Sequence, residues 1–232
     1  MTPFVYWLVT NVVHYMVLPV YGKVRVTGLD NLPRRGPLII VSNHLNDADP
    51  GVVATRIPRR LVFMTKVELF RVPILGQLLR LYGAFPVRRG EADLSALRRS
   101  NEALRDGLAL VLFPEGTRSS REARLRQAWP GAALIALRNR VPIVPVAITG
   151  SQYMGMPGMF LRVFRRYAIT LRIGEPFFLP MPPRINSESV EAGTRVLMEK
   201  IAALLPEEYR GYYGNKQGDE GGARAAPPAP NG

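Results

Sequence analysis

The chain contains no cysteine and only two histidines, His14 and His44. The missing cysteines exclude a disulfide framework, a thiolate zinc site, an iron–sulfur centre and a cysteine nucleophile. Two histidines are also too few for a histidine-rich metal site. A chain without cysteine is compatible with a reducing compartment.

Lysine and acidic residues are scarce relative to arginine. Four of the 31 basic residues are lysines and 27 are arginines. With 18 Asp and Glu residues, the formal net charge is +13. The arginine fork fits phosphate oxygens, although an arginine-rich, lysine-poor chain also fits a GC-rich genome. Eight of the basic residues and a single acid fall between Arg56 and Arg89. Such a basic surface predicts an anionic partner: nucleic acid, an acidic membrane face or a phosphorylated ligand.

The remaining composition is that of a folded chain, with 232 residues, 47% hydrophobic and 21% charged. Short apolar runs bounded by turn residues are typical of buried parallel strands, and they alternate with stretches of helical periodicity. The pattern predicts an α/β fold with a central, mostly parallel sheet flanked by helices. Strands are predicted over 24–27, 38–42, 60–64, 108–113, 142–148 and 168–173, and helices over 68–82 (broken by Pro73 and Gly76), 93–106, 131–138 and 187–205.

The two ends of the chain differ from this domain. Residues 4–21 are apolar and carry no charged residue other than His14, and as a helix they would extend about 27 Å, slightly less than a bilayer core. A buried core helix is one interpretation; Trp7 and three tyrosines favour a helix inserted into one membrane interface. We therefore predict a membrane-associating helix over 1–22, one folded domain over 23–213 and a disordered Gly/Pro/Ala-rich tail over 214–232.

The first candidate site segment, residues 42–50, reads SNHLNDADP and directly follows a predicted strand. His44 would leave the carboxyl end of a buried strand, where α/β proteins bind ligands. A turn can bring Asp49 back onto the imidazole, where a carboxylate fixes the tautomer and raises the basicity of the other ring nitrogen. The alternative is a polar turn in which an aspartate caps the next helix.

A second segment, residues 113–119, reads FPEGTRS and follows another apolar strand. Gly116 permits a tight turn with exposed backbone N–H groups, and Thr117 and Arg118 add side-chain donors, as in an anion-binding nest. Glu115 would either order Arg118 or contact a substrate hydroxyl. A surface turn with a salt bridge is the alternative.

Two further segments are less specific. Residues 83–90 read GAFPVRRG, in which Arg88 and Arg89 could grip a phosphate in bidentate fashion. Residues 141–148 read VPIVPVAI, and two prolines are unusual in a central strand, so we expect an irregular strand end close to the site.

Together, in their order and spacing, the four segments resemble the four sequence blocks of the glycerolipid acyltransferase family, whose bacterial members include the 1-acyl-glycerol-3-phosphate (lysophosphatidic acid) acyltransferases. The resemblance covers residues 25–180 and implies an αβα-type domain. It matches His44 to the catalytic histidine, Asp49 to its orienting acid and Arg89 to the arginine of the second block. It matches the third block, which is credited with binding the acceptor phosphate, to Glu115, Gly116, Thr117 and Arg118.

The resemblance implies a membrane-associated enzyme that moves a fatty acyl group from acyl-CoA or acyl carrier protein to a lysophospholipid hydroxyl. The expected acceptor is 1-acyl-sn-glycerol 3-phosphate, which gives phosphatidic acid. The expected location is the cytoplasmic face of the cell membrane, as a peripheral or monotopic protein. No metal or cofactor is required, and the oligomeric state stays open.

One departure and three alternatives accompany this interpretation. Family members often carry a lysine before the helix that follows the third block, where this chain has Trp129, so the acceptor could be another lysophospholipid or a glycolipid. A non-catalytic lipid-binding protein would have no need of His44 and Asp49. Nucleic-acid binding is disfavoured, because no recognised motif is present and aromatic residues are not interleaved with the arginines.

Overall fold

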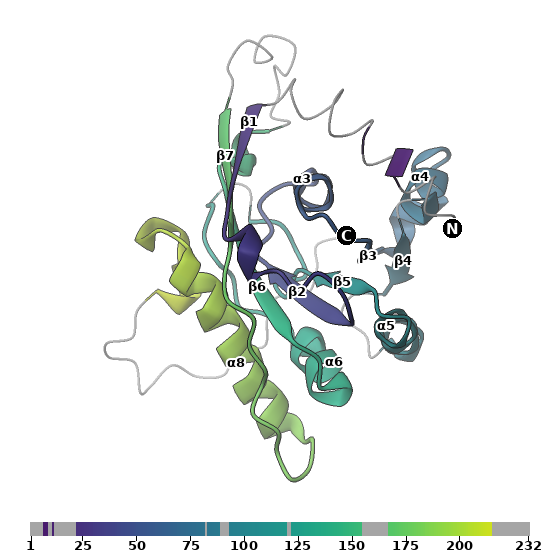
Figure 1. The fold of residues 1–232 in the computed structure, drawn as a ribbon, viewed down its shortest axis with the longest axis vertical. Helices are drawn as coiled ribbons and strands as arrows, with labels where there is room; N and C mark the ends of the chain where they lie inside the picture. Colours follow the sequence, from purple (N-terminus) through teal and green to yellow (C-terminus); the bar gives the residue numbers. More distant parts are fainter. Residues whose placement is uncertain are drawn as a thin grey trace.

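Seven strands form one sheet in the order β1-β7-β6-β2-β5-β3-β4 (Figure 1). The structure, a computed structural model, describes residues 7–8, 11, 22–81, 83–88, 93–119, 122–154 and 167–214. The strands are β1 (Gly22–Thr27), β2 (Leu38–Ser42), β3 (Leu61–Lys66), β4 (Ala84–Val87), β5 (Ala109–Leu112), β6 (Ile143–Thr149) and β7 (Tyr167–Ile173).

All neighbouring strands are parallel except β6 and β7, which are antiparallel. The predicted mostly parallel α/β sheet is therefore confirmed. Strands β6, β2, β5, β3 and β4 run in the same direction, so their carboxyl ends lie at one edge of the sheet. Loops that leave these ends are brought together there even when they are far apart in sequence.

Helices cover both faces of the sheet because successive strand residues point to opposite sides. In β2, Ile39 and Val41 pack with α5 (Leu94–Arg105), α6 (Gly131–Asn139) and α8 (Ser187–Leu204). The alternate residues, Leu38 and Ile40, pack on the other side with α3 (Asp49–Arg56). All five residues of β2 are buried, which explains the uninterrupted apolar run in the sequence.

The predicted helix over 68–82 is only partly correct. A 3₁₀ helix, η3 (Val67–Arg71), is followed by the short helix α4 (Leu75–Leu81). Pro73 separates the two, as expected from its missing N–H. Gly76, by contrast, lies inside α4; a Cβ there would be 2.3 Å from the Phe70 carbonyl oxygen, so close packing on η3 requires glycine at this position.

The fourth sequence block forms a regular strand, and the predicted irregular end is wrong. Strand β6 continues through Pro145, whose carbonyl oxygen accepts a hydrogen bond from Gly174 N at 2.9 Å. Pairing with β7 begins at the next residue, Val146, opposite Ile173. The proline therefore lies where β6 needs no N–H for the β7 ladder, which makes proline tolerable in a central strand.

Most of the two predicted terminal segments lies outside the described residues. Of the apolar segment 4–21, the structure describes Trp7, Leu8 and Asn11, which are helical, and the Asn11 amide donates to the Trp7 carbonyl at 2.7 Å. Of the predicted tail, it describes Gly214 alone. Within the described ranges, no helix combines the length and the apolar character needed to cross a bilayer.

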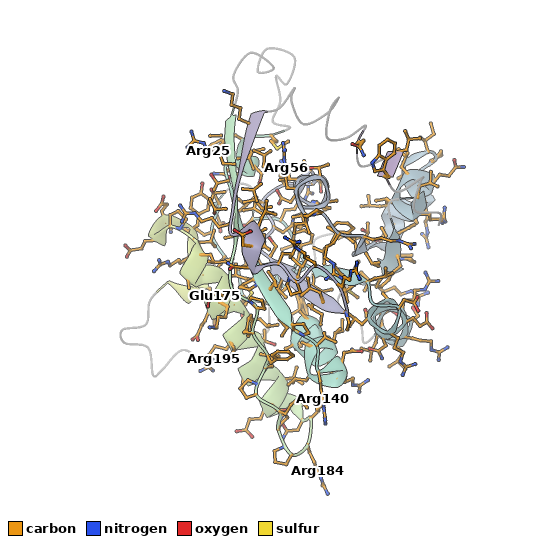
Figure 2. The ribbon with its side chains drawn as sticks, in the orientation of Figure 1. Arg25, Arg56, Arg140, Glu175, Arg184 and Arg195 are labelled. Atoms are coloured by element: carbon orange, nitrogen blue, oxygen red, sulfur yellow. The ribbon has the colours of Figure 1, made fainter. Side chains whose placement is uncertain are left out.

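The basic residues are spread over the molecule. Figure 2 shows Arg25 and Arg56 at its upper end and Arg140 and Arg184 at its lower end.

Candidate active site

Two polar loops lie side by side at the carboxyl edge of the sheet. Residues 43–48 follow β2, and residues 113–119 follow the adjacent parallel strand β5. Asn43, which is 2% exposed, anchors the first loop to β6 on the other side: its amide donates to Ile148 O at 2.8 Å, and its Oδ1 accepts from Ile148 N at 2.7 Å. The side chain of Asn43 thus extends the hydrogen-bonded ladder by one residue beyond the strand.

His44 and Asp49 form a buried pair. The imidazole Nδ1 lies 3.0 Å from Asp49 Oδ2, and the same oxygen accepts the backbone N–H groups of Leu45 and Asn46, each at 2.7 Å. Asp49 is fully buried and does not cap α3, whose N-cap residue is Ala48 with no side-chain cap. The capping alternative is therefore wrong, and the predicted return of Asp49 onto the imidazole is present.

The orientation of the imidazole leaves its second nitrogen available. Phe113 stacks on the ring at 4.3 Å between centroids, and the His44 side chain keeps 8% of its surface exposed. If Nδ1 carries the proton that it shares with Asp49, Nε2 carries a lone pair. No hydrogen bond to Nε2 comes from any residue that the structure describes. The ring can therefore accept a proton on Nε2.

Glu115 connects the two loops. Its side chain is 1% exposed; Oε1 accepts from His44 N and Oε2 from Arg126 N, both at 2.9 Å. The prediction that Glu115 orders Arg118 is therefore wrong. Each carboxylate oxygen accepts one backbone donor, and the predicted contact of Glu115 with a substrate hydroxyl stays a prediction. Glu115 instead joins the loop of His44 to the segment that follows the FPEGTRS block.

Burial dominates the ionisation of this carboxyl. Desolvation raises the pKa of Glu115 from 4.5 to about 7, and the nearby charge of Asp49 adds to the rise. The two backbone N–H groups and the charge of Arg126 favour the ionised form and therefore oppose this rise in the pKa. A group with this pKa changes its charge near neutral pH.

Arg118 forms an ion pair with Asp47 of the first loop. Both side chains are exposed, 51% for Arg118 and 74% for Asp47. Ion pairs at this exposure contribute at most about 1 kcal/mol, so the guanidinium can exchange its carboxylate for another anion. The salt-bridged turn foreseen as an alternative is thus present, with Asp47 as the partner.

The turn at Gly116 is tight but does not form the full nest expected. Gly116 has φ +65°, and its N–H donates to Phe113 O at 3.0 Å, so it is not available to an anion. The backbone N–H groups of Thr117 and Arg118 donate to no acceptor within the described part of the chain. Two amides and one guanidinium therefore remain for anion binding.

Trp129 covers this turn. A Cβ on Gly116 would lie 2.7 Å from Trp129 Cδ1, and Trp129 N donates to Pro114 O at 2.9 Å. The aromatic side chain at the position of the expected lysine is therefore in contact with the turn.

Sequence reasoning missed two residues that hold the loops of the site, Asn43 and Ser119. The Ser119 N–H donates to His44 O at 2.9 Å. A polar residue directly after an apolar strand was the only available signal for Asn43. Arg89 lies outside the described residues, so its predicted role stays a prediction. Among the side chains that the structure describes, no group of three His, Asp or Glu is placed to hold a metal ion.

The raised pKa of Glu115 predicts a pH-dependent stability. Between about pH 4.5 and about pH 7 the unfolded chain ionises this carboxyl while the folded chain keeps it protonated. The unfolded state then binds fewer protons, so the free energy of unfolding falls as the pH rises, and the fall ends above pH 7. In Glu115→Gln this contribution is absent. The free energy of unfolding of the wild type should therefore fall by up to about 3 kcal/mol relative to that of the variant across this pH window.

Equilibrium urea unfolding at several pH values measures the difference. Glu102→Gln, at an exposed position of α5, is the control and should follow the wild type. Parallel stability curves for wild type and Glu115→Gln would contradict the assignment.

Comparison with known proteins gives a consistent family assignment. The sequence profile of the Acyltransferase family matches residues 23–149. The chain is 30% identical to the 1-acyl-sn-glycerol-3-phosphate acyltransferase of Bacillus subtilis over 194 residues, covering 82% of this chain and 92% of that protein. It is 27% identical to the enzyme of the same name from Streptococcus pneumoniae over 215 residues, 91% of this chain and 77% of that protein.

The fold also has a solved counterpart. The crystal structure of the 1-acyl-sn-glycerophosphate (LPA) acyltransferase PlsC from Thermotoga maritima superimposes with a TM-score of 0.61 at 23% identity, covering 84% of this chain and 75% of that one. At this identity the similarity establishes the α/β fold. From the profile match and the similarity to the Bacillus enzyme, the chain belongs to the acyltransferase family and is an O-acyltransferase.

Proposed function

We propose that this protein transfers a fatty acyl group from a thioester, acyl-CoA or acyl carrier protein, to the free hydroxyl of 1-acyl-sn-glycerol 3-phosphate, giving phosphatidic acid. The observation that carries the proposal is the buried contact between His44 Nδ1 and Asp49 Oδ2 beside the Gly116 turn. The names of the relatives supply the acceptor class.

The reaction follows from the orientation of the imidazole. Asp49 accepts a hydrogen bond from the Nδ1–H group, so Nε2 is the nitrogen that removes the proton of the acceptor hydroxyl as its oxygen attacks the thioester carbonyl. The tetrahedral intermediate collapses with cleavage of the carbon–sulfur bond, and His44 returns the proton to the departing thiolate. The Asp49 charge stabilises the imidazolium between these steps. General base catalysis of this kind contributes about 10²- to 10⁴-fold in rate.

The acceptor phosphate would bind at the Gly116 turn. The N–H groups of Thr117 and Arg118, which donate to no acceptor among the described residues, can donate to its oxygens, and the Arg118 guanidinium can leave Asp47 for a doubly charged phosphate. Arg89 is proposed as a further phosphate ligand on the resemblance alone. Glu115 holds the turn and does not contact the acceptor in this proposal.

Membrane association is proposed at a surface beside the site. Helices η3 and α4 follow the carboxyl end of β3, and this end lies at the same edge of the sheet as His44. The two helices and the residues between them expose large apolar side chains, which we call the η3–α4 face: Leu69, Val72, Ile74, Leu78 and Leu81.

Basic side chains accompany this face. Arg71 and Arg80 are exposed and Lys66 is half-buried, whereas Glu68 is the one acid in the stretch. An apolar face with basic residues fits an anionic bilayer, from which long-chain substrates would reach the site. The predicted helix over 1–22 would add a second contact, and we propose that the protein is peripheral or monotopic at the cytoplasmic face of the cell membrane.

A glycolipid acceptor is the second candidate, because the Trp129 indole lies against Gly116. An aromatic surface at this position suits the C–H face of a sugar better than a phosphate. Acylation of a panel of lysophospholipids and glycolipids with a single acyl-CoA would separate the two acceptors.

The central test replaces each member of the buried pair. His44→Ala should abolish the release of free CoA from acyl-CoA in the presence of lysophosphatidic acid, and Asp49→Asn should lower kcat by at least about 100-fold. Asp106→Asn, at an exposed position after α5, is the matched control and should retain wild-type turnover. Wild-type turnover in a folded His44→Ala protein would remove the proposed base.

Arg118→Ala tests the phosphate site. The apparent KM for lysophosphatidic acid should rise about tenfold or more, because a charge-assisted contact is lost, while the KM for acyl-CoA is unchanged. Arg138→Ala, exposed in the last turn of α6, is the control. An effect confined to the acyl donor would instead assign Arg118 to that substrate.

The double variant Ile74→Ser, Leu78→Ser tests the η3–α4 face. Two large side chains that are 73% and 46% exposed would no longer enter the bilayer, so partition onto vesicles containing anionic lipid should weaken about tenfold or more. Phe178→Ser is the control: Phe178 is 63% exposed but lies beside Phe177, which pairs with the first residue of β6 at the opposite edge of the sheet. Equal sedimentation of all three proteins with vesicles would refute this surface.

A further inference from the structure

The C-terminal residues after α8 return to the candidate site. Two 3₁₀ helices, η5 (Glu207–Tyr209) and η6 (Gly211–Tyr213), form what we call the C-terminal strap, residues 207–213. The strap packs on residues 125–129, the segment between the FPEGTRS block and α6. None of the four sequence blocks includes the strap.

Three hydrogen bonds tie the strap to this segment. Leu125 N donates to Tyr209 O at 2.8 Å, Tyr212 N donates to Leu125 O at 3.0 Å, and Ala128 N donates to the Tyr213 hydroxyl at 3.1 Å. The approach is close: Gly211 has φ +46°, and a Cβ there would be 2.3 Å from Leu125 O.

The other side of the same segment holds the acceptor turn. Arg126 N donates to Glu115 Oε2 at 2.9 Å, and Trp129 N donates to Pro114 O at 2.9 Å. The N–H groups of residues 125 and 128 thus point to the strap, and those of 126 and 129 point to the turn. A displacement of the segment on the strap side would therefore move its contacts with the turn.

We propose that Tyr213 is a positioning residue for the acceptor-binding turn: its hydroxyl fixes Ala128 and thereby seats the adjacent Trp129 on Gly116. The inference rests on the proposed function in so far as the turn binds the acceptor. Tyr213 does not touch the reacting atoms, and its effect passes through Ala128 and Trp129.

The environment of the hydroxyl supports this role. Ala128 is 8% exposed, so its N–H would have little access to water if the hydroxyl were removed. Burial raises the pKa of the Tyr213 phenol above its ordinary value of 10, and the charge of Glu115 contributes to the rise. The phenol therefore stays neutral in the physiological range. A second tie, from Gln152 Nε2 to the Tyr209 hydroxyl at 2.7 Å, holds the strap from the side of η4 (Ser151–Tyr153).

Tyr213→Phe and Tyr212→Phe form a matched pair. Both variants delete one hydroxyl from the strap, but Tyr212 is 66% exposed and its hydroxyl makes no hydrogen bond within the described residues. Its ring lies edge-on to that of Tyr213 at 5.1 Å, a contact that phenylalanine retains.

The kinetic readout separates positioning from general stability. In Tyr213→Phe the apparent KM for lysophosphatidic acid should rise about five- to tenfold, because a buried N–H loses its acceptor, while kcat and the KM for acyl-CoA stay within about twofold. Tyr212→Phe should match the wild type. An unchanged acceptor KM, or a fall in kcat that follows the fraction of unfolded protein, would overturn the proposal.

A second readout does not depend on turnover. The chain has two tryptophans, Trp7 and Trp129, so a full-length Trp7→Phe background leaves Trp129 as the only indole. Adding Tyr213→Phe should shift its emission to longer wavelength and increase quenching by acrylamide, whereas adding Tyr212→Phe should not. Identical spectra for the two proteins would overturn the positioning role, even if the wild type proved inactive toward lysophosphatidic acid.

A backbone variant keeps the test decisive if Tyr213→Phe does not fold. Gly211→Ala should push the strap off Leu125 O and give the same spectral change with the Tyr213 hydroxyl still present. Gly107→Ala is its control, because Gly107 also has a positive φ, +72°, but a Cβ there meets nothing within 4 Å. Equal spectra for these two glycine variants would also overturn the proposal.

Discussion

The Glu115 carboxylate lies between the two loops of the candidate site, with one oxygen on the His44 amide and the other on the Arg126 amide. These loops follow different strands, and the backbone of a loop that leaves a sheet has no ladder to satisfy its N–H groups. Glu115, which lies on the loop after β5, accepts one N–H from the loop after β2 and one from the segment 125–129. Together with the Ser119 N–H, which donates to His44 O at 2.9 Å, this side chain holds the imidazole in place relative to the Gly116 turn.

The other contacts of the site build on this connection. Asp49 collects three donors on one oxygen, the His44 ring and the N–H groups of Leu45 and Asn46, so the loop and the imidazole are fixed by the same atom. Phe113 stacks on the face of the His44 imidazole ring. A ring held at Nδ1 and along its face keeps one orientation, which is the arrangement that a general base requires. Burial of these polar groups is tolerated because they are hydrogen-bonded; among the described residues, Asp49 Oδ1 is the atom of the pair that has no partner.

The site is also layered outward from the sheet. Behind the Gly116 turn lies the segment 125–129, and behind that segment lies the C-terminal strap. The strap is the last described element of the chain, whereas the turn follows β5 near the middle of it. The acyltransferase family profile ends at residue 149, so this outer layer comes from a part of the chain that the profile does not cover.

Much of the fold and part of the site could be predicted from the sequence. Apolar runs such as 38–42 became buried strands, and the predicted helix over 93–106 is present as α5, with Asp93 as its N-cap through Ser95 N and Ala96 N. These features depend on neighbours within a few residues, where backbone geometry leaves few options. The exception was the 68–82 segment, where Pro73 separates η3 from α4, whereas Gly76 lies inside α4 and permits its close contact with Phe70.

The sequence by itself determined the α/β class, the short reach from His44 to Asp49 and the positive φ that Gly116 adopts, because each is a local consequence of residue type and spacing. Only the tertiary structure decided that Glu115 would face the His44 amide, that Asp47 would pair with Arg118 and that Tyr213 would reach Ala128. Each of these pairs is separated by 71 or more residues. These pairs form because the parallel strands bring distant loops to one edge of the sheet and because a buried donor without an acceptor costs free energy. A local sequence pattern shows neither which loops meet nor which donors become buried.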